Sequence, residues 1–424
     1  MNFFISASLA FFVLSIYTAH YIVELHKTTK DSAERDFVSK TSLYVSIEEE
    51  EDVSYSPLQQ DYYRDSCPSA ERIIRKALKE IYKARPSIAP SLIRLLFHDC
   101  FIEVRFCKTA NGFLFMDCCL RICLNLDTID SIEGCDASVL LDADESQTSE
   151  KEAPPNLSLK GLDVIAFIKS ELENTCPGVV SCADTLALAT KEAVSLAGGP
   201  KYSLRIGRKD SLVTFKDIAQ RELPSPHATL SEILARFASR GFSPQETVSL
   251  LGAHSIGITH CTFFQDRLYN FSGTGKPDPE LNTGFLQELK SKCPFSASAS
   301  SPSPCPDTAS APSLPASDYH TNYGLSSENQ IDGTIDLSFN NEGGYLNFGS
   351  RYYRRLLQNK GVMFSDQQLM ASEETETWVR AYASDPLLFQ RDFIKSMVKL
   401  SSYHVLTGPL GQVRTNCSKV LPLN

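Results

Sequence analysis

Arg94 and His98 lie four positions apart in the segment Ala89–Cys100, and together they could perform acid–base chemistry. On a helix, side chains four residues apart project from one face. A neutral imidazole beside a fixed guanidinium combines a proton acceptor with a group that stabilises developing negative charge. A buried arginine and histidine neutralised by a neighbouring carboxylate would show the same spacing. The segment alone therefore leaves a catalytic and a structural interpretation open.

A third candidate, His254, stands among small residues in the apolar segment Glu246–Gly257. Small neighbours allow a flat macrocycle to approach the backbone, and an imidazole in such a place can be the axial ligand of a haem iron. A lone histidine on an apolar helix is more commonly a core residue. The case for a ligand rests on the presence of Arg94 and His98 in the same chain.

Helices must position these side chains, because helical periodicity dominates the chain from about Asp61 onward. Apolar residues recur at helical spacing in residues 70–82, 161–174, 182–196, 229–239 and 245–257. Strand patterns are few and short, and no internal repeat is apparent. The sequence therefore predicts a single, mostly α-helical domain.

Two stretches interrupt this helical pattern. Residues 103–132 are rich in Cys and Leu, and residues 295–345 are rich in Ser, Pro, Gly and Asn. The second stretch predicts a long surface loop. The first has neither helix caps nor strand alternation, so we expect a loop there if the segment is part of the functional protein.

The N-terminal 60 residues differ in composition from the rest of the chain. An apolar run from Phe3 to about Ala19 predicts a signal peptide or an uncleaved signal anchor within residues 1–24. Residues 25–60 are polar and include the acidic run Glu48–Asp52, which predicts a disordered spacer. We expect a secreted protein that meets a membrane only if the first segment is an anchor.

Charge and cysteine content narrow the partners and the compartment. The chain has 41 Lys and Arg against 51 Asp and Glu, a formal charge of −10, and no basic cluster, so we expect no nucleic-acid binding. Its 13 cysteines indicate an oxidising compartment. Because the number is odd, at least one thiol lacks a partner within the chain.

The two histidine segments together resemble the distal and proximal active-site patterns of the class III secretory plant peroxidases. The resemblance runs from about Tyr62 to Cys417, and its C-terminal half is most similar to the peroxidase 48 subgroup. It includes Asp61–Pro68, Gly134–Asp142 and Gly207–Ser211. The resemblance implies a mostly α haem peroxidase fold over residues 61–417, with haem b between the distal and proximal helices of two lobes, followed by a tail at 418–424.

On the distal side, the resemblance implies that His98 takes a proton from hydrogen peroxide and returns it to the leaving oxygen. Arg94 would stabilise the charge on the departing hydroxide, and Phe97 would form a wall of the cavity. Asn156 would hydrogen-bond the other nitrogen of His98 and keep the imidazole basic.

On the proximal side, the resemblance implies that His254 binds the iron through one nitrogen. Asp366 would accept a hydrogen bond from the other nitrogen. This bond gives the imidazole imidazolate character, which favours cleavage of the oxygen–oxygen bond of peroxide. Taken alone, Asp366 would be interpreted as a turn or helix-cap residue.

The resemblance also implies four disulfides. They pair Cys67 with Cys176, Cys100 with Cys135, Cys182 with Cys417, and Cys261 with Cys293. Five cysteines remain, namely Cys107, Cys118, Cys119 and Cys123 in the first unusual stretch and Cys305 in the second. Their spacing has no paired C-x-x-C character and no adjacent histidine, which argues against a zinc site.

Calcium sites with oxygen ligands are a further implication of the resemblance. The distal site maps to Asp99, the carbonyls of Ile102 and Gly134, Asp136 and Ser138. Ser255, Asp336 and Ser338 are candidates for a proximal site, but Gly349 stands where the family supplies a ligand carboxylate. We expect one calcium per chain, bound at the distal site.

The implied reaction is the oxidation of small phenolic donors by hydrogen peroxide, carried out by a monomeric, extracellular or cell-wall enzyme. Of the sequons at Asn156 and Asn270, the second is the glycosylation candidate, because an active-site asparagine cannot carry a glycan. The alternative is a catalytically silent wall or membrane-tethered protein that keeps the fold as a binding module. A Soret band together with peroxide-dependent phenol oxidation would distinguish the two.

Deleting residues 103–132 would join Phe101-Ile102 to Glu133-Gly134-Cys135-Asp136, the run that the family pattern leads us to expect. Thirty extra residues inside the loop closed by Cys100 and Cys135 raise the cost of closing it. Glu103-Val104-Arg105 is compatible with a splice donor, because valine codons begin with GT. We therefore hypothesise that this segment is a translated intron.

Overall fold

The computed structural model describes residues 58–102, 104–108, 114–116, 129–145, 147–295, 333–338 and 348–422 of the chain. The signal segment 1–24 and nearly all of the spacer 25–60 lie outside these residues, as do the side chains of 104–133 and most of 295–345. Described structure begins slightly before Asp61, because Gln59 forms an isolated β-bridge with Ile206.

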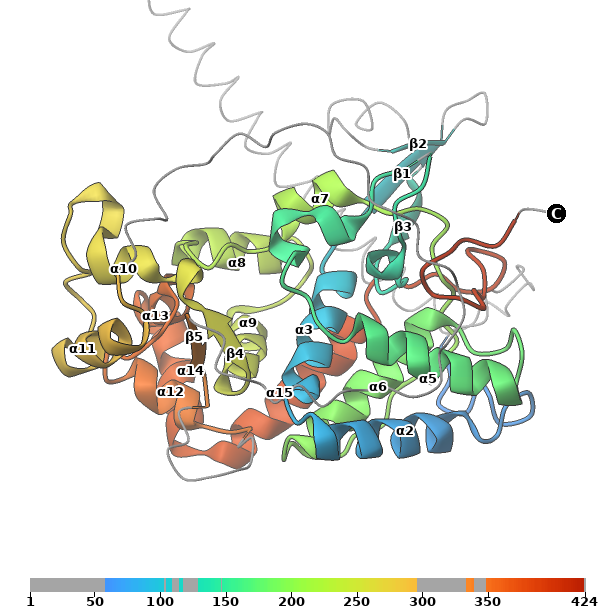
Figure 1. Ribbon diagram of the computed structural model, residues 1–424, viewed down its shortest axis with the longest axis horizontal. Coiled ribbons are helices and arrows are strands. Elements are labelled where there is room, and N and C mark those ends of the chain that lie inside the picture. The colour runs from blue at the N-terminus through green and yellow to red at the C-terminus, as the bar shows by residue number, and fades with distance from the viewer. Residues whose placement is uncertain are drawn as a thin grey trace, which may run out of the picture. The chain divides into compact units, whose positions relative to one another are not determined.

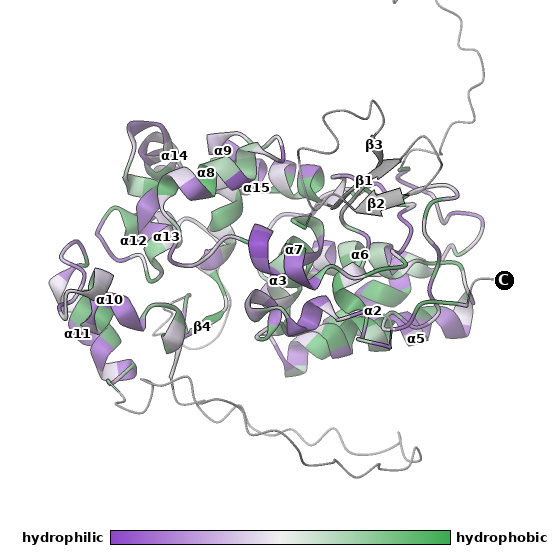
Figure 2. Cartoon of the chain, turned by 90° about the horizontal axis from the view of Figure 1, so that it is seen from above, coloured by the Kyte–Doolittle hydropathy of each residue, from purple (hydrophilic) through white to green (hydrophobic). Residues whose placement is uncertain are grey.

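Four helices form one group, shown in blue and green in Figure 1: α2 (Ala70–Ala84), α3 (Ile88–Cys100), α5 (Leu162–Thr175) and α6 (Cys182–Leu196). Helix α6 packs against the other three, and its residues from Cys182 to Thr190 are all buried. Much of α6 is coloured hydrophobic in Figure 2. The serine before it, Ser181, accepts a hydrogen bond from the Asp184 amide and so caps the helix.

A second group contains most of the remaining helices, whereas α7 (Lys216–Glu222) contacts the 3₁₀ turns Glu150–Glu152 and Pro154–Asn156 beside the distal residues. The group consists of α8 (Leu230–Ala238), α9 (Pro244–Leu251), α11 (Thr283–Lys292), α14 (Glu373–Ser384) and α15 (Pro386–Ser401), with the shorter α10 (Gln265–Tyr269), α12 (Arg351–Leu356) and α13 (Phe364–Gln367). Capping boxes begin α8 and α9, where Thr229 pairs with Glu232 and Ser243 with Glu246. Helix α15 contacts both α9 and α3, so it connects the two groups.

The helices confirm the fold expected from periodicity, with one difference that matters for the site. The sequence predicts a helix over 245–257, but α9 ends at Leu251 and is followed by a 3₁₀ turn, Gly252–Ser255. A Cβ atom on Gly252 would lie 2.3 Å from the Tyr353 hydroxyl and 2.4 Å from the Phe389 ring. Only glycine allows this close packing at the turn that carries His254.

Short strands occur in both stretches that the sequence predicts to be loops. Residues 104–133 contain β1 (Val104–Lys108), β2 (Leu114–Met116) and β3 (Ile129–Glu133), paired antiparallel in the order β2-β1-β3. Further along, β5 (Thr334–Asp336) pairs antiparallel with β4 (Ile258–His260). Backbone pairing forms these ladders without the alternation of apolar residues that sequence inspection relies on.

All four predicted disulfides are present: Cys67–Cys176, Cys100–Cys135, Cys182–Cys417 and Cys261–Cys293. The bond from Cys182 to Cys417 fastens the C-terminal segment to the start of α6. Residues of the predicted tail also contact the domain, because the Asp142 amide donates to the Ser418 carbonyl. No helix in the described part of the chain is long and apolar enough to cross a membrane.

Candidate active site

Helix α3 presents Arg94 and His98 on one face, as their spacing predicts. His98 Nδ1 lies 2.6 Å from Asn156 Oδ1, and Asn156 Nδ2 donates to the Glu150 carbonyl at 2.8 Å. Because the amide nitrogen of Asn156 is used as a donor, its oxygen must accept from His98. The proton of the neutral imidazole is thereby assigned to Nδ1, which leaves Nε2 as the proton acceptor.

Burial sets the protonation of this pair. Burial of the imidazole, together with the neighbouring charge of Arg94, lowers the pKa of His98 to about 3. Burial also lowers the pKa of Arg94 to about 10, so the guanidinium stays charged at neutral pH. The arrangement therefore holds a neutral base beside a fixed cation.

A short 3₁₀ turn, Pro154–Asn156, positions both distal side chains. Arg94 Nη2 donates to the Pro155 carbonyl at 2.8 Å, one residue before the asparagine that holds His98. Phe97 stacks on Phe101 with ring centroids 4.6 Å apart and meets His98 edge-on. The aromatic stack restricts the side chain of Phe97 beside the imidazole.

His254 lies in the 3₁₀ turn after α9, and its Nδ1 is 2.8 Å from Asp366 Oδ1. The same carboxylate oxygen accepts a hydrogen bond from the Tyr352 hydroxyl at 3.0 Å. The Asp366 side chain is 2% exposed, whereas that of His254 is 38% exposed. A buried carboxylate therefore orients an imidazole whose other nitrogen is free to bind a ligand.

Asp366 lies on α13, and the residues before and after it, Ser365 and Gln367, are both fixed by hydrogen bonds. The Ser365 amide donates to the Pro226 carbonyl at 3.0 Å, and the Gly361 amide donates to Gln367 Oε1 at 3.0 Å. The buried Arg267 donates to the Gly361 and Val362 carbonyls just before this helix. The proximal carboxylate is thus fixed by contacts from several segments of the chain.

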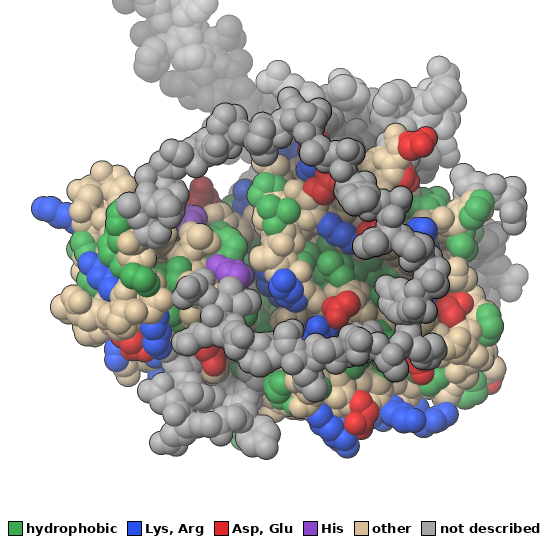
Figure 3. Space-filling model, viewed as in Figure 1, with side chains coloured by type: hydrophobic (Ala, Val, Ile, Leu, Met, Phe, Trp, Pro, Cys, Tyr) green, Lys and Arg blue, Asp and Glu red, His purple; other side chains and the backbone are tan. Residues whose placement is uncertain are grey.

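The distal and proximal elements are neighbours, since α3 contacts the turn Gly252–Ser255. Among the described residues, none hydrogen-bonds Nε2 of His98 or of His254. Histidine side chains reach the surface in the face shown in Figure 3, beside hydrophobic side chains. A free imidazole nitrogen on a turn of small residues fits an axial iron ligand, so the residues present suit a haem group.

A second set of polar groups surrounds Asp99 and Asp136, each 1% exposed. Burial raises the pKa of both carboxyls, and the charge of Asp136 adds to the effect on Asp99. Asp99 Oδ1 is buried and has no hydrogen-bond partner in the described structure. Two buried carboxylates, one of which has an unpartnered oxygen, fit a site for a cation.

The loop after α3 supplies carbonyl oxygens to the same place. A Cβ atom on Gly134 would lie 3.4 Å from each of the Cys100, Ile102 and Tyr403 carbonyl oxygens. Cys135 and Ala137 have positive φ values of 47° and 59°, a strained conformation that turns this short loop back on itself. No group of three acidic, cysteine or histidine side chains within the described ranges could hold a metal. The expected calcium ligands include only two such side chains, those of Asp99 and Asp136, because the other ligands are backbone carbonyls and Ser138.

Glu150 links this cation site to the distal histidine, and sequence reasoning missed it. Its carbonyl accepts from Asn156, its Oε1 accepts from the Phe215 amide at 2.9 Å, and its Oε2 is buried without a described partner. Burial and the charge of Asp136 raise the pKa of Glu150 to about 8. Glu150 lies six residues before Asn156, but nothing in its residue type distinguishes it from an exposed glutamate.

The candidates for a proximal calcium site are not brought together in the same way. Ser255 Oγ is buried and unpartnered, but the Asp336 side chain is exposed and its Oδ1 accepts from the amide and hydroxyl of Ser338. Gly349 supplies no side chain. The described residues therefore do not form a complete proximal calcium site.

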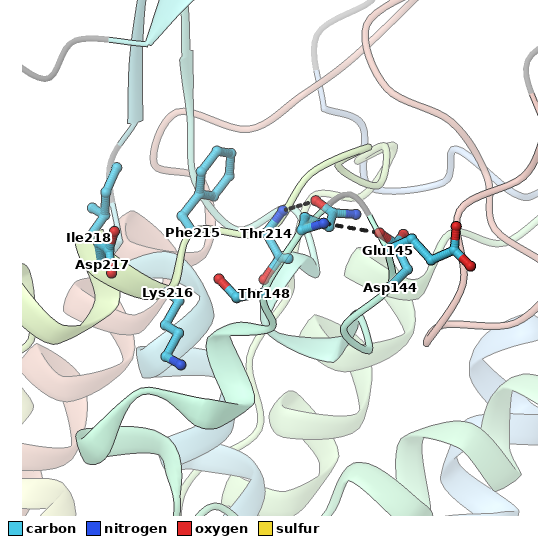
Figure 4. A pocket seen from close by; sticks show the side chains of 9 residues that line it. Asp144, Glu145, Thr148, Thr214, Phe215, Lys216, Asp217 and Ile218 are labelled. Carbon is cyan, nitrogen blue, oxygen red and sulfur yellow. Dashed lines mark hydrogen bonds between the residues drawn. The ribbon is translucent and has the colours of Figure 1, made fainter.

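A cavity of about 420 Å³ lies outside this machinery (Figure 4). It is lined by Asp144, Glu145, Gln147 and Thr148 together with residues 214–218. Gln147 bridges the two segments by accepting from the Thr214 amide, and Thr214 Oγ1 accepts from the Glu150 amide. None of the predicted site residues lines the cavity, although Thr214 and Phe215 in its wall hydrogen-bond Glu150.

The family model and the relatives that match this chain are all peroxidases by their names. A model of the peroxidase family, described as "Peroxidase", matches residues 74–385. The chain is 65% identical over 382 residues to "Putative Peroxidase 48" of Arabidopsis thaliana, which covers 90% of the chain and 87% of the relative. It is 37% identical to "Peroxidase N" of Armoracia rusticana over 85% of the chain and 90% of the relative, and 34% identical to "Peroxidase 54" of Arabidopsis thaliana over 92% of both.

Proposed function

Since the chain belongs to the peroxidase family and is a peroxidase, we propose that it uses the distal site at His98 to reduce hydrogen peroxide and oxidises small phenolic donors. The observation that carries this proposal is the paired arrangement of the two histidines. Each has Nδ1 bound to an oxygen acceptor, on Asn156 and Asp366, and each has Nε2 free.

The distal residues supply proton transfer and charge stabilisation. His98 Nε2 accepts the proton of the bound peroxide and then donates it to the departing oxygen. Arg94, fixed to the Pro155 carbonyl, stabilises negative charge on that oxygen. Asn156 keeps the imidazole in the tautomer that this proton transfer requires.

On the proximal side, His254 Nε2 would bind the iron of haem b, which when bound would store the two oxidising equivalents of peroxide and pass them to the donors. Asp366 withdraws the Nδ1 proton toward itself and makes the imidazole a stronger donor. The family resemblance implies haem and calcium, and the geometry at His254 and at Asp99 suits these two roles. The same geometry argues against a catalytically silent binding protein.

We place the protein outside the cell, as a monomer with Asn270 as its glycosylation site. Four disulfides suit an oxidising compartment. Asn270 is exposed, whereas Asn156 is 3% exposed and bonded to His98. Intact mass before and after glycosidase treatment, for the protein and an Asn270→Gln variant, tests the assignment.

Reconstitution tests the central proposal. Refolded protein with haem and calcium should show a Soret band, a spectral change after one equivalent of peroxide, and phenol oxidation that requires peroxide. A Soret band without the peroxide-dependent change would contradict the proposal and favour the silent binding protein.

We predict one calcium per chain, held at the distal site. Metal analysis after exhaustive dialysis should give about one calcium per haem, and Asp99→Asn should remove it because a ligand carboxylate is lost. Chelation should lower the unfolding temperature and slow the peroxide reaction, since Glu150 connects this site to Asn156. Asp336→Asn is the matched control and should leave the calcium content unchanged. Two calcium ions per haem would contradict the prediction.

We also predict that most transcripts lack the codons for residues 103–132. Their removal leaves nine cysteines, of which eight form the four disulfides and Cys305 stays alone. In the described part of this segment, β1 pairs antiparallel with β2 and β3. Sequencing of the transcript is decisive, and a dominant message that encodes the segment would refute the prediction.

A further inference from the structure

We propose that Trp378 is a second donor-oxidation site, from which a chain of aromatic side chains carries electrons to the proximal side of the haem pocket. The donor would be a polymeric phenol, too large to approach the haem edge. This inference rests on the proposed function, because peroxide reduction at His98 must supply the oxidant. It adds a surface site that the small-donor reaction does not use.

The path is a continuous series of ring contacts between His254 and Trp378. Ring centroids are 6.4 Å apart from His254 to Tyr352, 5.0 Å from Tyr352 to Tyr353, 5.2 Å from Tyr353 to Tyr382, and 5.9 Å from Tyr382 to Trp378. All four separations lie in the range of direct aromatic contact. Each ring after the histidine belongs to a residue type that can lose an electron.

The phenols on this path have the proton partners that tyrosine oxidation needs. A phenol that loses an electron must also release its hydroxyl proton, and the hydroxyls of Tyr352 and Tyr382 each have a carboxylate within hydrogen-bond distance. Tyr352 donates to Asp366 Oδ1 at 3.0 Å, and Tyr382 donates to Asp392 Oδ2 at 3.1 Å. A carboxylate can hold the phenolic proton and return it when the tyrosine is reduced again.

Tyr353 has a different role, since its hydroxyl donates to the Val248 carbonyl at 3.0 Å. A backbone carbonyl cannot take up the phenolic proton. We therefore assign Tyr353 the role of a bridge between Tyr352 and Tyr382, whose rings it contacts on either side.

Trp378 is the outer end of the path and the only tryptophan of the chain. It is partly exposed on α14, whereas Tyr353 and Tyr382 are fully buried. The exposed carboxylate of Glu374 lies one helical turn away on α14, and negative charge near an indole favours its oxidised, cationic form. A large donor can meet this surface without entering a pocket.

The two electrons that one peroxide accepts equal the two that a pair of phenol groups gives. Reduction of one peroxide consumes two electrons that the bound haem would supply, and the Trp378 indole would return one electron to it along the tyrosines. A phenol group of the polymer gives one electron to the indole, and its O–H bond breaks with release of the proton to water. A second phenol group repeats the step, so one peroxide yields two phenoxyl groups.

The same aromatic side chains also pack the core, with Phe348 and Phe389 as neighbours. Packing alone predicts that phenylalanine, similar in size to tyrosine and smaller than tryptophan, can replace any of the oxidisable rings without an effect specific to one donor. Trp378→Phe is therefore the informative variant, because it keeps an apolar ring and removes the outer redox group. Tyr62→Phe is the matched control, since Tyr62 is a partly exposed aromatic residue that lies outside the path.

The test compares one phenol in two forms, free in solution and tethered to soluble dextran, with the haem-loaded enzyme. We expect Trp378→Phe to lower kcat/KM for the tethered phenol by about tenfold and to leave kcat/KM for the free phenol within about twofold. Tyr62→Phe should change neither value. Equal losses for both phenols, or no loss for the tethered one, would overturn the proposal.

A second measurement does not depend on turnover. A nitroso spin trap added with one equivalent of peroxide and no donor should label the peptide that contains Trp378, and the label should disappear in Trp378→Phe. Oxidation of the free phenol without any label on this peptide would overturn the inference while the proposed function stands. Absence of any reaction with peroxide would instead overturn the proposed function.

Discussion

The His98→Ala variant should bind haem as the parent does but react with hydrogen peroxide roughly 10²–10⁴-fold more slowly. The imidazole does not hold the iron in our assignment, because that role belongs to His254 on the other side of the pocket. Its removal takes away the proton acceptor and leaves Arg94 in place. Stopped-flow spectroscopy of the change that follows peroxide addition measures the effect directly.

The control for this prediction is the haem content of the variant. An unchanged Soret band shows that the distal substitution has not disturbed the proximal ligand. Arg94→Leu should also keep haem and should slow the peroxide step by about 10²–10³-fold, through loss of charge stabilisation. A His98→Ala variant that reacts with peroxide at the parental rate would refute the assignment of the distal base.

The pKa of His98 adds a pH dependence to this prediction. Burial lowers that pKa to about 3, so the neutral imidazole persists well into the acid range. The rate constant with peroxide should therefore stay constant as the pH falls from neutral, and it should decrease only as the pH approaches about 3. In the unfolded chain the same histidine has a pKa of about 6.5 and binds a proton earlier. Its contribution to stability is thus present above that value and is lost as the pH falls toward the folded-state pKa.

Local patterns in the sequence were enough to predict the main helices and the side-chain pair on α3. The periodicity that predicts helices over 182–196 and 229–239 is a local property, and a spacing of four fixes how Arg94 and His98 relate on one helix. The disulfides and the Asp366 assignment came from the family resemblance. His254 and Asp366 are 112 positions apart, and no local pattern connects them.

The parts that sequence inspection missed depend on tertiary contacts. The 3₁₀ turn at His254 follows from the packing of Gly252 against Tyr353 and Phe389, which lie more than one hundred positions away along the chain. The hydrogen bond from Tyr352 to Asp366 depends on the packing of α12 near α13. The strands at 104–133 form by backbone pairing, which leaves little mark on residue type.

The Tyr352 contact bears on the strength of the proximal ligand. Tyr352 and His254 donate to the same oxygen of Asp366, at 3.0 and 2.8 Å. A second donor withdraws negative charge from the carboxylate, so less charge is available to polarise the imidazole. The hydroxyl therefore moderates the imidazolate character of His254, while it holds Asp366 in place.

The second large effect is expected for His254→Ala, which should lose haem or bind it in a disordered way. His254 is the only described side chain that the structure places to bind iron through a free Nε2 with a buried carboxylate behind it. Alanine leaves the turn Gly252–Ser255 intact but supplies no ligand. Gel filtration after reconstitution should therefore recover much less haem per chain than for the parent, and added imidazole should restore part of it by occupying the vacated space.

Asp366→Asn is the matched variant for this prediction, because it keeps the His254 ligand and removes the charge that polarises it. It should retain haem and shift the ferric–ferrous potential upward. The frequency of the iron–histidine stretching band should fall, since a neutral amide leaves the imidazole a poorer electron donor. His254→Ala therefore tests whether His254 binds the iron, and Asp366→Asn tests whether Asp366 polarises that ligand. A His254→Ala protein that keeps full haem content, with an unchanged iron–histidine band and the parental peroxide rate, would show that the iron has another ligand.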